Sequence, residues 1–115
     1  MYCAPNPATA LVEVMAHAEI DFEDLPVTYR YLEIDVPESA SRETVGAPAK
    51  RAEVAATRRI GDEWLGSGRT ALLIVPCAIV RVTMNILINP RHPHSRRIRI
   101  AKVHEQAVDP RLAGK

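Results

Sequence analysis

Glu13 is the carboxylate in this sequence whose position best suits chemistry on a ligand. Helical periodicity over residues 7–17 predicts one buried stripe, and Glu13 lies at the border of that stripe. A carboxylate at the edge of a cleft can stabilise positive charge that develops on a ligand. His17 is four residues further on, so the two side chains could instead form an ordinary surface pair. The stripe itself consists of Ala8, Leu11, Val12 and Met15.

A second candidate is the turn Gly66-Ser67-Gly68, which is followed at once by Arg69. The two glycines permit positive φ and close backbone approach, so Ser67 could present its hydroxyl and its N–H together. Arg69 could bind a phosphate through two parallel hydrogen bonds. The alternatives are a plain helix C-cap and a solvent-facing arginine. The turn is neither a nucleophile elbow nor a phosphate-binding Walker loop, because the flanking residues of those motifs are missing.

The histidines and cysteines do not predict a metal centre. His92, His94 and His104 have no carboxylate or cysteine spaced to complete a ligand set. Cys3 and Cys77 fit two reduced thiols in a cytoplasmic protein. A local basic patch fits a solvated edge strand better than a single-strand nucleic-acid platform, since no aromatic residue follows Trp64. That patch consists of Arg91, Arg96, Arg97 and Arg99.

The elements that must position these residues are short and mixed in type. Asn6 is expected to cap a helix that starts at Pro7 and ends near residues 17–19. Residues 27–36 alternate as a strand, residues 38–49 are expected to be a polar connector, and residues 50–65 are expected to be helical. Further strands are predicted in four segments: residues 71–75, buried on both faces, then 78–82, 85–88 and 98–103. The sum is an α+β fold with helices early and strands late.

Composition limits the class of protein. The chain has 115 residues, is 47% hydrophobic and carries a formal charge of +1. This apolar fraction excludes a wholly disordered chain, and the length fits one small domain. No apolar run approaches the ~20 residues of a membrane span, and the near-neutral charge predicts no recruitment to nucleic acid or to a membrane surface.

Several segments together resemble the RES domain family. The first runs from Gly61 to Thr70 and continues into the apolar residues 72–76. The second covers residues 85–93, and weaker matches follow at residues 98–100 and 109–112. Tyr2 followed by a helix that bears Glu13 also resembles the start of the family pattern. The similarity extends over nearly the whole chain in the same order, so residues 1–115 are interpreted as a single RES domain.

The resemblance implies a fold similar to that of ADP-ribosyltransferase toxins: a split, mainly antiparallel β core with flanking helices. It implies a bacterial toxin of a toxin–antitoxin pair whose substrate is NAD+, with no metal. Such proteins cleave the nicotinamide–ribose bond by phosphorolysis or hydrolysis, or transfer ADP-ribose to a protein. The implied partner is a helical DNA-binding antitoxin. By position, Glu13 and Ser67 match the family's glutamate and serine, and Tyr2 matches the tyrosine that lines the NAD pocket.

One departure from the family pattern bears on activity. The family arginine precedes the tyrosine, and this sequence starts one residue before Tyr2. The sequence therefore predicts a partial RES domain that lacks its N-terminal strand region, with little turnover unless Arg69 compensates. Unpaired sheet edges would lower stability and favour self-association into homo-oligomers. The alternative hypothesis is a non-catalytic remnant that only binds antitoxin or is vestigial, and a start site further upstream is the third.

Overall fold

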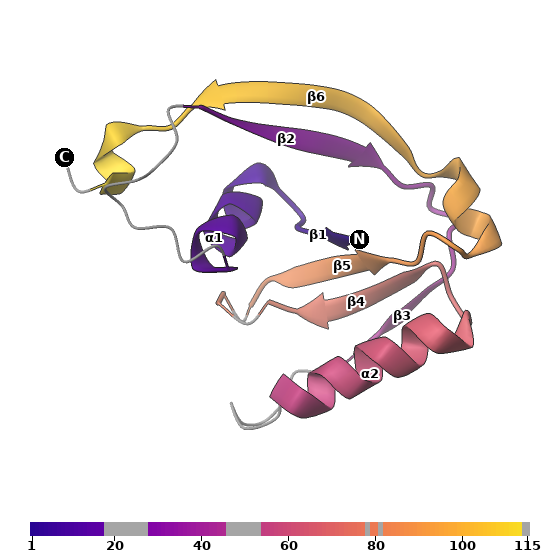
Figure 1. Cartoon of the computed structure of the whole chain (residues 1–115). Coiled ribbons are helices and arrows are strands. Elements are labelled where there is room, and N and C mark those ends of the chain that lie inside the picture. The colour runs from indigo at the N-terminus through magenta and orange to yellow at the C-terminus, as the bar shows by residue number, and fades with distance from the viewer. Residues whose placement is uncertain (18–27, 46–53, 78, 81, 114–115) are drawn as a thin grey trace.

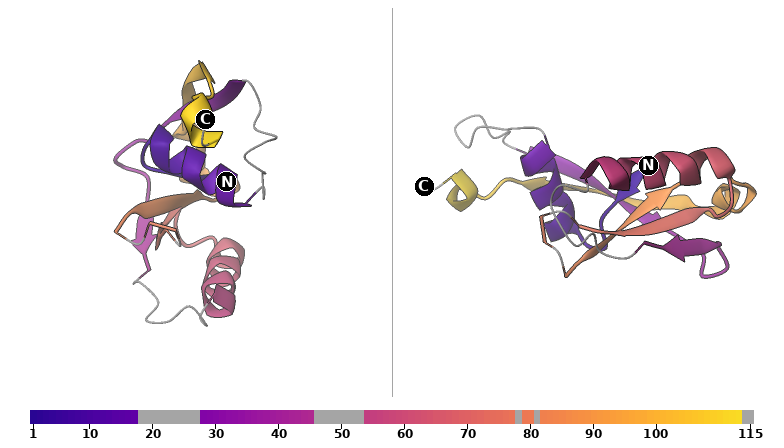
Figure 2. Two further views of the ribbon diagram at one scale, coloured as in Figure 1. Left: turned by 90° about the vertical axis from the view of Figure 1, so that its left-hand side faces the viewer. Right: turned by 90° about the horizontal axis from the view of Figure 1, so that it is seen from below.

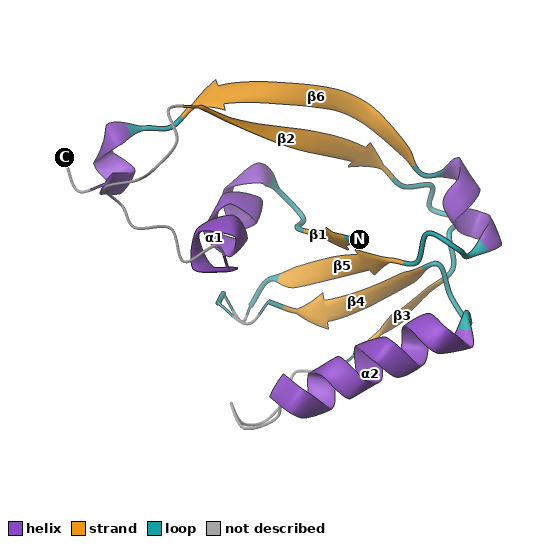
Figure 3. Ribbon diagram, viewed as in Figure 1, coloured by secondary structure: helices purple, strands orange, loops and turns teal. Residues whose placement is uncertain are grey.

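Two sheets and two α-helices make up the computed structural model, which describes residues 1–17, 28–45, 54–77, 79–80 and 82–113 (Figures 1 and 3). One sheet has four strands in the order β1-β5-β4-β3, and the other is a ribbon of β2 and β6. Only the β3–β4 pairing is parallel among the described strands. The expected α+β class is confirmed, and the described strands form two sheets with mainly antiparallel pairings. The strands are β1 (Tyr2–Cys3), β2 (Thr28–Asp35), β3 (Arg42–Thr44), β4 (Leu72–Pro76), β5 (Met84–Ile88) and β6 (Arg99–Ala107).

Helix α1 (Pro7–His17) begins as the sequence predicts. The Asn6 side chain accepts a hydrogen bond from the backbone N–H of Thr9 at 2.9 Å, which satisfies one of the unpaired N–H groups of the first turn. The predicted stripe is wrong in part, because Ala8 and Val12 are exposed while Glu13 is only 6% exposed. This helix therefore buries a carboxylate in the centre of its inner face, which an apolar periodicity cannot reveal.

Helix α2 (Val54–Ser67) covers one face of the four-stranded sheet, on the side away from the ribbon (Figures 1 and 2). Its Trp64 packs with Leu73 and Val75 of β4. The opposite face carries a second apolar cluster that includes Leu72 and Ile88 and extends to Ile34 at the end of β2. Strand β4 is thus buried on both faces, as its continuous apolar run predicts.

Two predicted segments and the predicted order of helices and strands differ from the structure. The connector expected over residues 38–49 contains β3, which adds to the edge of β4 although it has only three residues. The strand expected over residues 78–82 is wrong: Ile79 and Val80 form a bend and Val82 lies in a turn, while residues 78 and 81 lie outside the described part. Helices do not precede strands along the chain, because α2 lies between β3 and β4.

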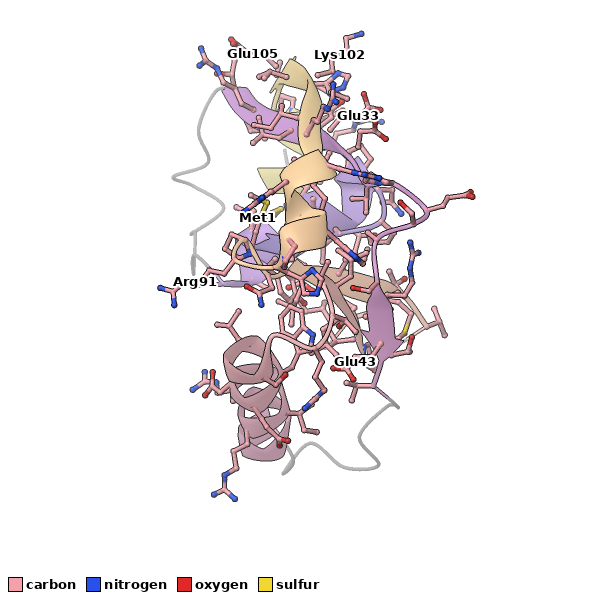
Figure 4. All side chains as sticks on the ribbon, turned by 90° about the vertical axis from the view of Figure 1, so that its right-hand side faces the viewer. Met1, Glu33, Glu43, Arg91, Lys102 and Glu105 are labelled. Atoms are coloured by element: carbon pink, nitrogen blue, oxygen red, sulfur yellow. The ribbon has the colours of Figure 1, made fainter. Side chains whose placement is uncertain are left out.

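The β2–β6 ribbon extends away from the four-stranded sheet (Figure 1). Leu32 of β2 and Val103 of β6 are cross-strand partners, and they are 49% and 58% exposed. The face of the ribbon that carries them therefore lacks a covering layer within the described residues. The other face is aromatic, with Tyr31 stacked on His104 at a centroid distance of 4.6 Å. Figure 4 labels Glu33 of β2 and Lys102 and Glu105 of β6, which belong to this ribbon at the top of that view. The radius of gyration, 15.7 Å, exceeds the ~13 Å expected for a compact domain of this length.

The sequence predicts neither a membrane span nor a metal centre, and only the described residues bear on these predictions. Among these residues, no helix is long and apolar enough to cross a membrane. No group of three or more histidine, cysteine, aspartate or glutamate side chains within the described ranges could hold a metal ion. Cys3 and Cys77 are free thiols. The arginines of the basic patch are all exposed, and a short 3-10 helix, Pro93–Arg97, carries two of them.

Candidate active site around Glu13

One oxygen of the Glu13 carboxylate gathers three side chains from distant parts of the chain. Its Oε1 accepts hydrogen bonds from the Cys77 thiol and from the Asn85 amide, both at 2.9 Å. The Tyr2 hydroxyl lies 3.5 Å from the same atom, at the outer limit of a hydrogen bond. Asn85 Nδ2 also donates to Tyr2 Oη at 2.6 Å. These four residues, Tyr2, Glu13, Cys77 and Asn85, are called the Glu13 cluster below.

Strand pairing brings the cluster together. Asn85 is the cross-strand partner of Val75, so its side chain lies on the same sheet face as that of Val75. Cys77 continues the alternation of Leu73 and Val75 just beyond the end of β4. The pairing of β1 with β5 places Tyr2 opposite Leu87. Helix α1 lies where β4 ends and β5 begins, and Glu13 completes the cluster from there (Figure 1).

The electrostatics favour a neutral tyrosine beside a carboxylate. Burial raises the pKa of the Tyr2 hydroxyl above its ordinary value of 10.0; the Asn85 hydrogen bond opposes this rise and the charge of Glu13 adds to it. Tyr2 is therefore a hydrogen-bond donor at neutral pH. Because a carboxylate only accepts, the Asn85 amide must turn its nitrogen toward Glu13. Its Oδ1 is buried and has no hydrogen-bond partner among the described residues.

A small open cavity of about 200 Å³ lies against this cluster. Its walls include Tyr2 and Glu13, and its lining is otherwise apolar. The other lining residues are Ala4, Ala10 and Val14. Tyr2 is 48% exposed as a whole residue and lines the cavity, so it can meet a ligand while its hydroxyl stays in the cluster. A carboxylate, a phenol and an apolar wall suit a flat ring next to a centre that becomes positively charged.

The family model of the RES domain matches residues 1–110. The chain therefore belongs to the RES domain family. It is 40% identical over 114 residues to Toxin Res of Pseudomonas putida, covering 97% of this chain and 78% of that protein. It is 35% identical over 127 residues to the Prs ADP-ribosylating toxin of a Sphingobium species, covering 100% of this chain and 75% of that protein. A Toxin Res of Photorhabdus laumondii is 31% identical over 98 residues, with 78% of this chain and 60% of that protein covered.

Of the four predicted site residues, the structure brings two together. Tyr2 and Glu13 meet in the cluster, as described above. Ser67 ends α2 ahead of β4, whereas Cys77 follows β4, and the five residues of that strand span ~13 Å. Ser67 and Arg69 thus lie toward the opposite end of β4 from Glu13 (Figure 1). The side chain of His17, the other predicted neighbour of Glu13, lies outside the described part.

In this RES chain Ser67 makes local contacts, and Arg69 pairs with two surface glutamates. Ser67 Oγ donates to the Trp64 carbonyl at 2.8 Å and accepts from the Arg69 N–H at 3.3 Å. Arg69 lies 3.2 Å from Glu43 and 3.8 Å from Glu63. Gly68 takes φ 63°, which identifies the turn as a helix C-terminus with a left-handed residue. These contacts are those of the C-cap alternative, and the functional roles of Ser67 and Arg69 stay predictions.

Sequence reasoning missed Cys77 and Asn85. Asn85 does carry a signal, because it is a polar residue within the apolar run of residues 84–88 that forms β5. An amide in a buried strand must find partners, so it points to a neighbouring polar group. Cys77 carries no comparable signal, since a buried free cysteine is common in apolar cores. Only its placement opposite Glu13 gives it a possible function.

Proposed function

We propose that this chain acts as a toxin of the RES type that cleaves the nicotinamide–ribose bond of NAD+. The observation that carries the proposal is the buried Glu13 carboxylate, held by three donors on the wall of an apolar cavity. The membership in the RES family and the similarity to an ADP-ribosylating toxin support NAD+ as the substrate. Residues 1–115 are taken as one RES unit with a core of the ADP-ribosyltransferase type.

The proposed chemistry needs one well-placed negative charge. As the bond between ribose C1′ and the nicotinamide nitrogen breaks, its electron pair leaves with nicotinamide and positive charge develops on the ribose. Glu13 stabilises that charge, and the Tyr2 ring packs against the leaving base. An oxygen of phosphate, water or a protein side chain then bonds to C1′. The cavity is smaller than the roughly 300–1,000 Å³ of drug-sized pockets, so it suits the nicotinamide end rather than the whole dinucleotide.

The partner of this toxin is proposed to be an antitoxin, because relatives in this family are named Toxin Res. Ser67 is retained as a proposed catalytic residue because it matches the family's serine, and Arg69 as a proposed NAD+ contact because an arginine can bind a phosphate through two hydrogen bonds. For Arg69 to bind a phosphate, it would have to leave Glu43 and Glu63.

Nicotinamide release tests the proposal directly. The protein is incubated with NAD+, with and without inorganic phosphate, and the products are separated by chromatography. Glu13→Gln should lower the initial rate by about 100-fold, since it removes the charge while keeping the shape. Glu105→Gln is the matched control, because this exposed glutamate of β6 pairs only with Arg30 of the ribbon among the ion pairs of the described residues, and its rate should equal that of the parent protein.

Two outcomes would overturn the proposal: no nicotinamide release by the parent protein, or an unchanged rate in Glu13→Gln. The first would favour the non-catalytic alternative. Ser67→Ala tests the role that the family resemblance implies for Ser67. Unchanged nicotinamide release in this variant would remove Ser67 from the site. Circular dichroism of each variant shows that a lost rate does not come from a lost fold.

A further inference from the structure

Asn85 is a polar residue in a position that the fold would fill with an apolar one. It lies in β5 with a fully buried side chain, next to Ile86 in sequence and opposite Val75 across the sheet. Burying an amide costs free energy unless its groups find partners, and its Oδ1 has none among the described residues. Packing alone does not account for an asparagine here, because an apolar side chain would avoid that cost.

The amide nitrogen of Asn85 joins two residues that come from different elements. Its two N–H groups are directed to Glu13 Oε1 at 2.9 Å and to Tyr2 Oη at 2.6 Å. By donating to Tyr2, it occupies a lone pair of the phenol oxygen, so the phenol proton must point elsewhere. The direct contact between Tyr2 and Glu13 is longer, at 3.5 Å. Asn85 is therefore the stronger link between the two cavity-lining groups.

We propose that Asn85 is a positioning residue, which fixes the Glu13 carboxylate and the Tyr2 hydroxyl relative to one another. This inference rests on the proposed function for its catalytic consequence, but the bridge itself can be tested without activity. Asn85 does not line the cavity. It acts through the two residues that do, so its loss should affect the rate of the chemical step more than substrate binding.

The first measurement follows the ionisation of Tyr2 by ultraviolet difference titration. Each protein is compared with its own Tyr2→Phe derivative, so that Tyr29 and Tyr31 cancel. Burial raises the pKa of Tyr2 and the Asn85 hydrogen bond opposes that rise. Asn85→Asp keeps the size of the side chain but replaces the donors with an acceptor, so the pKa of Tyr2 should rise further.

Asn89 provides a matched control for this substitution. It is also a buried asparagine, at 2% exposure, and it directly follows β5. Its Oδ1 accepts from the Arg91 backbone N–H at 3.0 Å, a role that an aspartate can keep. Asn89→Asp should leave the Tyr2 titration unchanged. If Asn85→Asp does not fold, Asn85→Ala should give the same upward change, because it removes the same donor.

The second measurement is the steady-state rate of nicotinamide release. Asn85→Asp should lower kcat by about 100-fold, in line with the cost of misplacing a reacting group, while KM changes by less. An unchanged Tyr2 titration in both Asn85 variants overturns the positioning role, whatever the activity. A parent protein that releases no nicotinamide overturns the proposed function instead. The Tyr2 titration then still tests whether Asn85 links Tyr2 to Glu13.

Discussion

The two ends of β4 differ in how their polar residues are held. Ahead of the strand, Ser67 and Arg69 are exposed and bond to near neighbours or to surface glutamates. Beyond the strand, Cys77 is buried and contacts Glu13, which is 64 residues away in the sequence. The Ser67 contacts need only a helix end to form, and the Arg69–Glu43 pair adds one exposed contact with β3. The group beyond the strand requires β1, α1, β4 and β5 to be in place, so it exists only in the folded chain.

This difference bears on where function is expected in the molecule. A Gly-Ser-Gly turn attracts attention in a sequence because its residues are consecutive, yet its contacts here are those of a helix terminus. The Glu13 cluster leaves no consecutive motif, and Tyr2 and Asn85 are 83 residues apart. Buried polar groups that depend on tertiary structure point to a function more strongly than exposed local ones. The following variants test this contrast.

The largest expected effect is on stability at the buried end. Cys77→Ala removes the thiol of a residue that is 1% exposed, with its bond to Glu13 and its contact with the Val80 N–H. We expect a loss of about 2 kcal/mol in the free energy of unfolding, measured in urea. Ser67→Ala also removes one hydrogen-bonding atom, but an exposed one, and should change that free energy by less than about 0.5 kcal/mol. Equal losses in the two variants would contradict the contrast.

An intermediate effect is expected at the two glycines beside Ser67. Gly68 has φ 63°, so Gly68→Ala should cost about 1 kcal/mol from backbone strain, although no atom lies within 4 Å of the new Cβ. Gly66→Ala also meets no atom within 4 Å, and it should stabilise α2 by about 0.5 kcal/mol. Thermal unfolding should show a destabilised Gly68→Ala and a stabilised Gly66→Ala. Destabilisation by Gly66→Ala would show that this turn is more than a helix terminus.

A smaller effect is expected for the surface pair at the same end. Arg69 and Glu43 are 3.2 Å apart, with side chains that are 50% and 35% exposed. Arg69→Gln should therefore lower the free energy of unfolding by less than about 1 kcal/mol at low salt. In 1 M NaCl the difference from the parent protein should vanish, since charges are screened over about 3 Å. A loss that persists in high salt would indicate that Arg69 is packed rather than paired.

The sequence predicted those parts of the fold and site that depend on local or periodic signals. Asn6 and Pro7 located the start of α1, and the apolar run of residues 71–75 located β4. The three residues of β3 carry no such signal, because that strand is defined by its pairing with β4. The burial of Glu13 has the same origin: its place in the core follows from Cys77 and Asn85, which no helical periodicity can anticipate.

The smallest predicted effect is a pH dependence that belongs to the buried end alone. The pKa of Tyr2 is raised in the folded protein, mainly by burial. Below pH ~10 the phenol is neutral in the folded and unfolded chains, so it contributes no slope. Above that pH the unfolded chain ionises first, and the free energy of unfolding should fall as the pH rises through the raised pKa. The effect is modest because the residue is 48% exposed.

Urea titrations between pH 8 and about 11 should show a shallower decline of the free energy of unfolding in Tyr2→Phe. The decline should be unchanged in Ser67→Ala. A decline that Tyr2→Phe leaves intact would mean that another group is its source and that the phenol is not held in the cluster.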